Sequence, residues 1–351
     1  MDWFERLTGF REAEAGYKTT RERLAVDGHT LRSLVNGRSF GIGELELVSL
    51  QSLRERVLAG SGPIGRLKVS IVRGDVRAMH QLAENSGALF QVASQFNLLE
   101  MVSPSVTPEH GVTHYVQDRT QGPACAIAAG AGTIYRNYFA PVGEGTGLAH
   151  GQTQGQTQSQ TQERQLDGLA DLGVALGRAT GRPTSTLWSM RNGYALCSRD
   201  GLAAISSHLN GLAPDAVDAL RGLLRIGVHR DVEVTDGDAP QRQFVTQAYC
   251  SALPVAYSQL PAALWKPFAQ LVLEAAYEAT LCAALLNARR GVSNVVLLTR
   301  LGGGAFGNDD EWIDAAMHRA LSMVSGLGLD VRLVSYGAPS RSLLDMEQAF
   351  G

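Results

Sequence analysis

The feature that most constrains the fold is a glycine-rich loop near the end of the chain, between an apolar run and an amphipathic segment. Residues 294–299 contain four consecutive apolar side chains, as expected of a strand buried on both faces. The loop that follows is Leu301-Gly302-Gly303-Gly304-Ala305-Phe306-Gly307-Asn308. Residues 311–325 then have helical spacing, and residues 330–336 predict a last strand. This order is a crossover unit, which predicts a parallel α/β sheet.

The composition of this loop suits the binding of a diphosphate-containing nucleotide. Glycines allow positive φ angles and close backbone approach, so that successive N–H groups and the helix N-terminus face an anion. Asn308 or Asp309 is expected to cap the helix. The alternative is a tight turn that only needs small residues. The chain lacks the Gly-Lys-Ser/Thr of a P-loop, and Gly74-Asp75, not a dinucleotide fingerprint, follows the first predicted core strand.

The rest of the chain is expected to form one elaborated domain. Residues 1–65 predict a helical N-terminal extension, and residues 66–351 the catalytic α/β domain. Within that domain, residues 145–163 are rich in Gln and Thr and have no apolar face, so we expect a disordered loop. Apolar periodicity predicts a first core strand at residues 67–72, further strands at 228–234 and 244–255, and helices at 163–178 and 262–288.

Charge and cysteine content narrow the class of protein. The 351 residues include 31 basic and 34 acidic side chains, and this net charge of −3 indicates neither nucleic acid nor a membrane as partner. The charged start of the chain does not resemble a secretory signal. The four cysteines form no close pair and the histidines no ligand spacing, so we expect reduced thiols, a cytoplasmic location, and neither metal nor cofactor.

Several longer stretches resemble a known family. They are Gly74-Asp75-Val76, residues 85–97, 118–126, 228–235 and 245–252, and the glycine loop. Together they resemble a divergent macrodomain family of arginine-specific ADP-ribosyl hydrolases, which includes a bacterial effector acting on ubiquitin. The chain is also distantly similar to poly(ADP-ribose) glycohydrolase, but lacks that enzyme's paired glutamates after a Gly-rich stretch.

The resemblance implies a mixed sheet between helices and removal of mono-ADP-ribose from arginine side chains of a protein such as ubiquitin. Two alternatives stay open. One is a macrodomain that binds ADP-ribose without cleaving it, and the other is a hydrolase of a free ADP-ribose derivative. For the second alternative, another free nucleotide also stays open as the substrate.

The expected ligand-binding residues fall into three groups. Asp75 is expected to accept from the adenine amine, although a turn role is the alternative. Asn85 and Asn97 flank the first candidate ligand loop, and Asn97 is expected at ribose hydroxyls or in a structural amide contact. The third group is the glycine loop with one following carboxylate, namely Gly302, Gly303, Gly304, Ala305, Phe306, Gly307, Asn308 and Asp310.

Carboxylates are the expected catalytic groups, because cleavage of an N-glycosidic bond needs an activated water and a stabilised oxocarbenium ion. Asp231 and Glu233 lie at positions i and i+2 of a predicted strand, so both are expected on one face of the sheet. A solvated edge strand is the alternative for this pair. Asp118 opens a polar turn and is either a third catalytic candidate or a turn cap.

Overall fold

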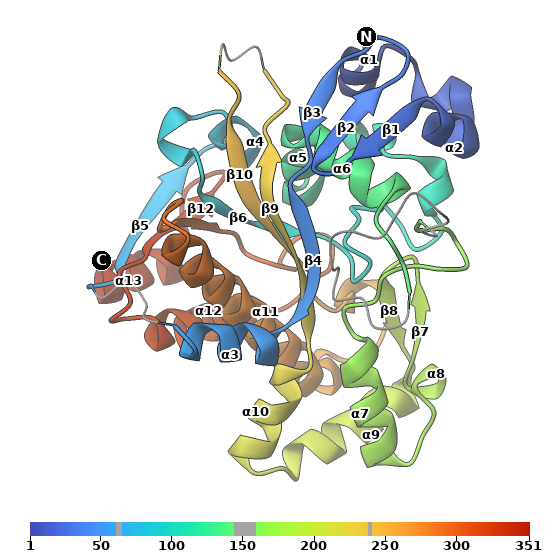
Figure 1. The fold of residues 1–351 in the computed structure, drawn as a ribbon. Helices are drawn as coiled ribbons and strands as arrows, with labels where there is room; N and C mark the ends of the chain where they lie inside the picture. Colours follow the sequence, from blue (N-terminus) through green and yellow to red (C-terminus); the bar gives the residue numbers. More distant parts are fainter. Residues whose placement is uncertain (61–64, 144–158, 238–240) are drawn as a thin grey trace.

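A seven-stranded mixed sheet forms the centre of the protein, in a computed structural model that describes residues 1–60, 65–143, 159–237 and 241–351 (Figure 1). The strand order is β4-β9-β10-β6-β11-β12-β5. Strands β10, β6, β11, β12 and β5 run parallel, while β9 is antiparallel to β10 and to β4. The strands are β4 (Glu44–Ser49), β5 (Lys68–Arg73), β6 (Leu89–Ala93), β9 (Arg225–Glu233), β10 (Phe244–Cys250), β11 (Val295–Leu298) and β12 (Asp330–Ser335).

Helices cover both faces of this sheet, which confirms the expected fold class. Along β11, Val296 and Leu298 belong to the same buried cluster as helix α11, whereas Leu297 belongs to the cluster on the other face. The first face carries α3 (Leu50–Leu58), α11 (Ala262–Arg289) and α12 (Asp310–Met323), and the second carries α4 (Val76–Met79), α5 (Gln121–Ala128) and α6 (Gly130–Tyr138). Helix α11 is long and apolar enough to cross a membrane, but 89% of its most apolar stretch is buried inside the protein.

The N-terminal segment differs from the expected helical extension. Helices α1 (Trp3–Thr8) and α2 (Glu12–Glu22) precede a three-stranded antiparallel sheet of β1 (Leu24–Asp27), β2 (Thr30–Ser33) and β3 (Ser39–Gly41). Strand β4 then joins the central sheet as its edge, before α3. Apolar residues of α1, such as Phe4 and Leu7, share a buried cluster with Ile134 of α6. The segment is therefore part of the domain's core, because it supplies both a strand and packing surface.

The middle of the chain also differs from expectation in two places. The expected disordered loop lies outside the described residues from 145 to 158, but Ser159 and Gln160 are buried. The Gln160 side-chain amide donates to the Arg136 carbonyl, and the Gln160 backbone carbonyl accepts from the Tyr17 hydroxyl. The helix expected from residue 163 begins only at Ala170, after this packed stretch.

The remaining elements lie mostly between β6 and β9 in the sequence. They are α7 (Ala170–Thr180), α8 (Thr184–Leu187), the hairpin β7 (Trp188–Arg191) and β8 (Tyr194–Cys197), α9 (Arg199–Asn210), α10 (Pro214–Gly222) and the last helix α13 (Arg341–Phe350). Short 3₁₀ turns are η1 (Ala83–Asn85), η2 (Pro108–His110), η3 (Thr113–Gln117) and η4 (Val255–Tyr257). The four cysteines are free thiols. Among these elements, β8 and η4 supply residues that line the candidate site, and η3 leads directly to it.

Candidate active site

A cavity of about 310 Å³ lies at the carboxyl ends of β6, β10 and β11. Ligands of parallel α/β sheets bind at this edge, because the loops that leave the strands converge there. Segments far apart in sequence form its walls: residues 93–95, 100–102, 118, 120–123, 194, 252, 257, 300–302 and 304–306. We call it the glycine-loop cavity. Its volume is at the lower end of the ~300–1,000 Å³ typical of small-molecule sites.

The shape of the glycine loop is fixed by its backbone conformation and by one buried side-chain amide. Gly302 (φ 77°) and Gly307 (φ 66°) adopt left-handed conformations that side chains rarely tolerate. The Asn308 side-chain amide donates to the carbonyls of Leu253 and Gly302, which closes the loop on itself. Asp309 caps α12 by accepting from the Glu311 N–H, as expected for one of the two candidate caps.

Two sets of unpaired backbone N–H groups belong to residues that line the glycine-loop cavity. Among the described residues, no acceptor faces the N–H groups of Gly304, Ala305 and Phe306. The same holds for Gln121 and Gly122 in the first turn of α5, which has no side-chain cap. Consecutive free N–H groups and an uncapped helix start both favour anions. The cavity therefore has anion-binding groups on two of its walls.

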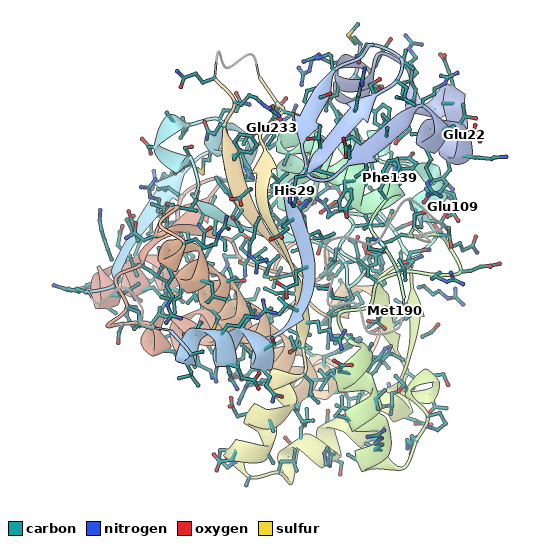
Figure 2. All side chains as sticks on the ribbon, in the orientation of Figure 1. Glu22, His29, Glu109, Phe139, Met190 and Glu233 are labelled. Atoms are coloured by element: carbon teal, nitrogen blue, oxygen red, sulfur yellow. The ribbon has the colours of Figure 1, made fainter. Side chains whose placement is uncertain are left out.

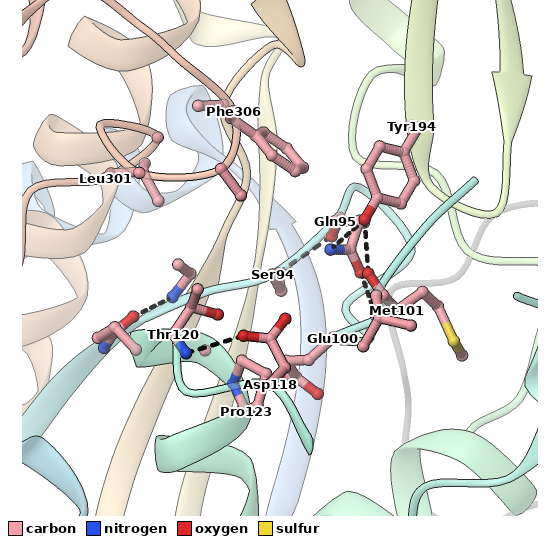
Figure 3. Close-up of a pocket in the computed structure, with 18 of the residues that line it drawn as sticks. Ser94, Gln95, Glu100, Met101, Asp118, Thr120, Pro123, Tyr194, Leu301 and Phe306 are labelled. Carbon is pink, nitrogen blue, oxygen red and sulfur yellow. Dashed lines mark hydrogen bonds between the residues drawn. The ribbon is translucent and has the colours of Figure 1, made fainter. Parts of the chain in front are cut away.

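Two carboxylates form an acidic wall of the same cavity (Figure 3). Asp118 follows η3, is half-buried, and accepts from the Thr120 N–H at 2.8 Å. Glu100 lies deeper and pairs through both oxygens with Arg136, at 3.0 and 2.9 Å. Burial raises the pKa of the Glu100 carboxyl to about 7, although the Arg136 guanidinium opposes this rise. Asp118 is therefore the carboxylate open to a bound ligand, and Glu100 stands behind it.

Three aromatic rings form another wall. Phe306 of the glycine loop lies 5.2 Å from the Tyr194 ring and 5.8 Å from the Tyr257 ring, measured between centroids. The Tyr194 hydroxyl donates to the Met101 carbonyl at 2.5 Å, so the ring of β8 is fixed in place. Phe306 thus packs against other aromatics that line the cavity, and the three rings offer a flat apolar surface for a sugar or a base.

The structure brings together some of the residues predicted from the sequence and separates the others. Those that line the glycine-loop cavity are Asp118, Gly302, Gly304, Ala305 and Phe306. Gly303, Gly307 and Asn308 belong to the same loop but do not line it. Gly307 packs so closely on Ala256 that an added Cβ would lie 2.7 Å from the Ala256 Cβ. These three residues therefore shape the loop.

Asp231 and Glu233 lie near the end of β9, at the opposite end of the strands from the cavity. Figure 2 labels Glu233 there. Glu233 pairs with Phe244 at the start of β10, whereas the cavity lies beyond its end at Cys250. The seven residues of β10 span roughly 20 Å. Glu233 bonds to Arg242 and to the Gly41 N–H, and Asp231 bonds to Arg290. We therefore do not retain this pair as catalytic candidates, because the antiparallel direction of β9 carries them away from the cavity.

Four predicted ligand contacts also lie outside the glycine-loop cavity. Asp75 caps α4 through the Arg77 N–H, and together with Asn85 it lines a second cavity between β5 and β11. Asn97 is fully buried, where its amide donates to Gln165 and its carbonyl accepts from the Leu99 N–H. Asp310 forms an exposed ion pair with Arg300. These placements favour the turn and structural alternatives for Asp75 and Asn97.

Sequence reasoning missed Glu100, Tyr194, Tyr257 and Arg300, which line the cavity from four different segments. Glu100 comes three residues after the stretch 85–97 that resembles the family. This closeness was the one signal in the sequence that could have marked it as a site residue. Tyr194 lies on a hairpin about a hundred residues from the β6 loop, and no local pattern connects the two. Arg300 lies two residues after β11 and pairs with Asp314 and Asp310.

Comparisons with known proteins give only distant matches. No family model and no curated protein matches the chain. Poly(ADP-ribose) glycohydrolase from Deinococcus radiodurans in complex with ADP-ribose is similar at a TM-score of 0.45 and 11% identity, over 87% of this chain and 92% of that one. The enzyme from Thermomonospora curvata is similar at a TM-score of 0.42 and 13% identity, over 90% and 91% of the two chains. TM-scores below 0.5 do not establish a common fold or activity.

Proposed function

We propose that the glycine-loop cavity binds ADP-ribose and that the protein hydrolyses the N-glycosidic bond between ADP-ribose and an arginine side chain. The observation that carries this proposal is the set of unpaired N–H groups at Gly304–Phe306 and Gln121–Gly122 around one cavity. A diphosphate is an anion with oxygens on both sides, so it suits donors from two walls. The aromatic wall suits a ribose or adenine, and the sequence resemblance points to the same ligand.

Asp118 is the proposed catalytic carboxylate. In the reaction, the bond between the ribose C1″ and the guanidinium nitrogen breaks, and its electron pair leaves with a neutral guanidine. Asp118 accepts a proton from the attacking water, whose oxygen bonds to C1″, and the guanidine takes up that proton. The carboxylate also attracts the guanidinium of the substrate and stabilises the oxocarbenium ion.

Incubation with modified proteins tests this proposal. Purified protein is mixed separately with arginine-ADP-ribosylated and serine-ADP-ribosylated proteins, and free ADP-ribose is measured by chromatography. We expect release from arginine only. No release from either protein, together with calorimetric binding of ADP-ribose, would instead identify a binding module. Cleavage of free ADP-ribose derivatives alone would identify the third alternative.

The binding module is the second candidate, and one observation favours it. Asp118 is the half-buried carboxylate of the cavity, while the Glu100 side chain is fully buried against Arg136. A site that only binds ADP-ribose needs no second accessible carboxylate. The comparison of binding with release in the same preparation separates the two candidates.

The glycine loop provides a matched pair of variants. Gly304 lines the cavity, and an added Cβ there would meet nothing within 4 Å, so Gly304→Ala should fold normally. We expect its methyl group to weaken ADP-ribose binding by about tenfold or more, which corresponds to about 1.4 kcal/mol. Gly302→Ala should instead destabilise the fold by about 1–3 kcal/mol, because its Cβ would lie 2.4 Å from the Ala252 Cβ.

Urea unfolding and isothermal titration calorimetry measure both effects. The two variants should differ: Gly302→Ala should lose stability, and Gly304→Ala should lose affinity for ADP-ribose. Normal affinity in Gly304→Ala would show that this part of the loop does not face the ligand.

A further inference from the structure

We propose that Glu12, on helix α2 of the N-terminal segment, is a positioning residue for the acidic wall of the glycine-loop cavity. This inference rests on the proposed function, since it concerns the placement of Asp118 and Glu100. Glu12 does not line the cavity, and its side chain is buried beneath the segment that carries Asp118. Its influence must therefore pass through that segment.

The Glu12 carboxylate gathers four donors. It accepts from the Val112 N–H at 2.8 and 3.0 Å and from the Thr113 N–H and hydroxyl, both at 2.7 Å. The Tyr138 hydroxyl donates to it at 2.8 Å. The Val112 and Thr113 groups are those at the start of η3, which has no side-chain cap of its own. Glu12 thus supplies, from a distant part of the chain, the anion that this turn lacks.

The turn that Glu12 holds leads directly to both carboxylates of the acidic wall. The Tyr115 hydroxyl, in the middle of η3, accepts from the Glu100 N–H at 3.1 Å. Asp118 is the residue directly after η3. A shift at the start of this five-residue turn would therefore move Asp118 through the backbone, and Glu100 through its hydrogen bond to Tyr115.

Packing alone does not require a carboxylate at this position. The N-terminal segment is already anchored by a buried cluster that includes Trp3, Phe4 and Leu7. Burial raises the pKa of Glu12, so the fold accepts a desolvation cost that an apolar residue would avoid. Gly111, in the left-handed region at φ 79°, allows the close approach, because a Cβ there would lie 2.4 Å from the carboxylate. The carboxylate matters because it alone accepts from every donor at once.

The variant Glu12→Gln tests this role. Its side-chain NH₂ group is a donor, so it cannot accept from the donors that the carboxylate oxygen at that position now accepts from. We expect kcat for release of ADP-ribose from arginine to fall about 10- to 100-fold with KM nearly unchanged, because a displacement of about 1 Å of a catalytic group can cost as much as 10²-fold. Tyr138→Phe removes one of the four donors and should have a smaller effect. Glu14→Gln on the same helix, where the side chain is exposed, is the control and should leave kcat unchanged.

Leu7→Ala distinguishes positioning from general stability, because it weakens the same N-terminal packing but leaves the hydrogen bonds from Val112 and Thr113 to Glu12 in place. Equal losses of kcat in Leu7→Ala and Glu12→Gln at equal losses of stability would overturn the proposal. Hydrogen exchange gives a readout that does not depend on activity. At equal losses of stability, Glu12→Gln should speed exchange in residues 112–118 more than Leu7→Ala does.

If the wild type releases no ADP-ribose, the proposed function fails while the exchange result still decides the role of Glu12. Faster exchange confined to residues 112–118 would support it. Unchanged exchange there, or faster exchange spread over the whole N-terminal segment, would overturn it.

Discussion

Replacement of Asp118 by asparagine should lower kcat for release of ADP-ribose from arginine by about 10²–10⁴-fold, the range that general acid–base groups contribute. The amide keeps the size of the side chain and can still accept from the Thr120 N–H, so the turn should remain in place. It can neither take a proton from water nor attract a guanidinium. Affinity for free ADP-ribose, whose diphosphate the backbone N–H groups are proposed to bind, should change little.

Asp231→Asn is the matched control for this substitution. Asp231 is also a partly exposed aspartate, but it pairs with Arg290 and lies at the opposite end of the strands from the cavity. Asparagine tolerates its left-handed φ of 54°. Steady-state kinetics on an arginine-modified protein measures kcat, and calorimetry measures the affinity for ADP-ribose. Full activity in Asp118→Asn, or a comparable loss in Asp231→Asn, would exclude the assignment of the acidic wall.

Replacement of Arg136 by methionine should destabilise the protein by about 3–5 kcal/mol at pH 8, because it leaves Glu100 without its buried partner. The loss should be smaller at pH 5. Burial raises the pKa of Glu100 to about 7, above the ordinary value for a glutamate. The stability that the neutral carboxyl contributes is therefore fully present below that ordinary value and is lost as the pH rises through 7. Without the Arg136 guanidinium the charged form of Glu100 is still less favourable, so the free energy of unfolding should depend more steeply on pH.

Urea unfolding at several pH values measures this effect, and the double variant Glu100→Gln/Arg136→Met is the control. Arg136 also donates to the Leu98 carbonyl and the Tyr249 hydroxyl, so the double variant should remain less stable than the wild type. It should nevertheless lose the steep pH dependence, because no buried carboxyl remains there to ionise. An equal loss at pH 5 and pH 8 in Arg136→Met would show that Glu100 does not carry the effect.

Local patterns in the sequence predicted the glycine loop well. The apolar run at residues 295–298, the glycines and the capping aspartate are adjacent in the chain, so their arrangement depends on strand, turn and helix-cap chemistry alone. The polar turn at Asp118 was found for the same reason. Both line one cavity because parallel strands place their following loops at one edge of the sheet.

The prediction for Asp231 and Glu233 depended on information that the sequence does not contain. Their spacing indicates a shared face only in a regular strand, but the ladder between β9 and β10 shifts register opposite this region, and Asp231 has a positive φ. Strand direction then decides which edge a side chain reaches. Similarly, the contacts that join Glu100 to Tyr115 and Arg136 depend on packing between distant segments, which single-sequence patterns do not reveal.

The position of β4 has a consequence for how the chain reaches this fold during synthesis. Residues Glu44 to Ser49 pair with residues Arg230 to Arg225, so the first strand of the central sheet has its partner about 180 residues later in the chain. Until that partner emerges from the ribosome, the apolar side chains of β4, such as Leu45 and Leu47, have no sheet to pack on. The central sheet should therefore be completed late in synthesis, and the apolar face of β4 should be open to aggregation until then.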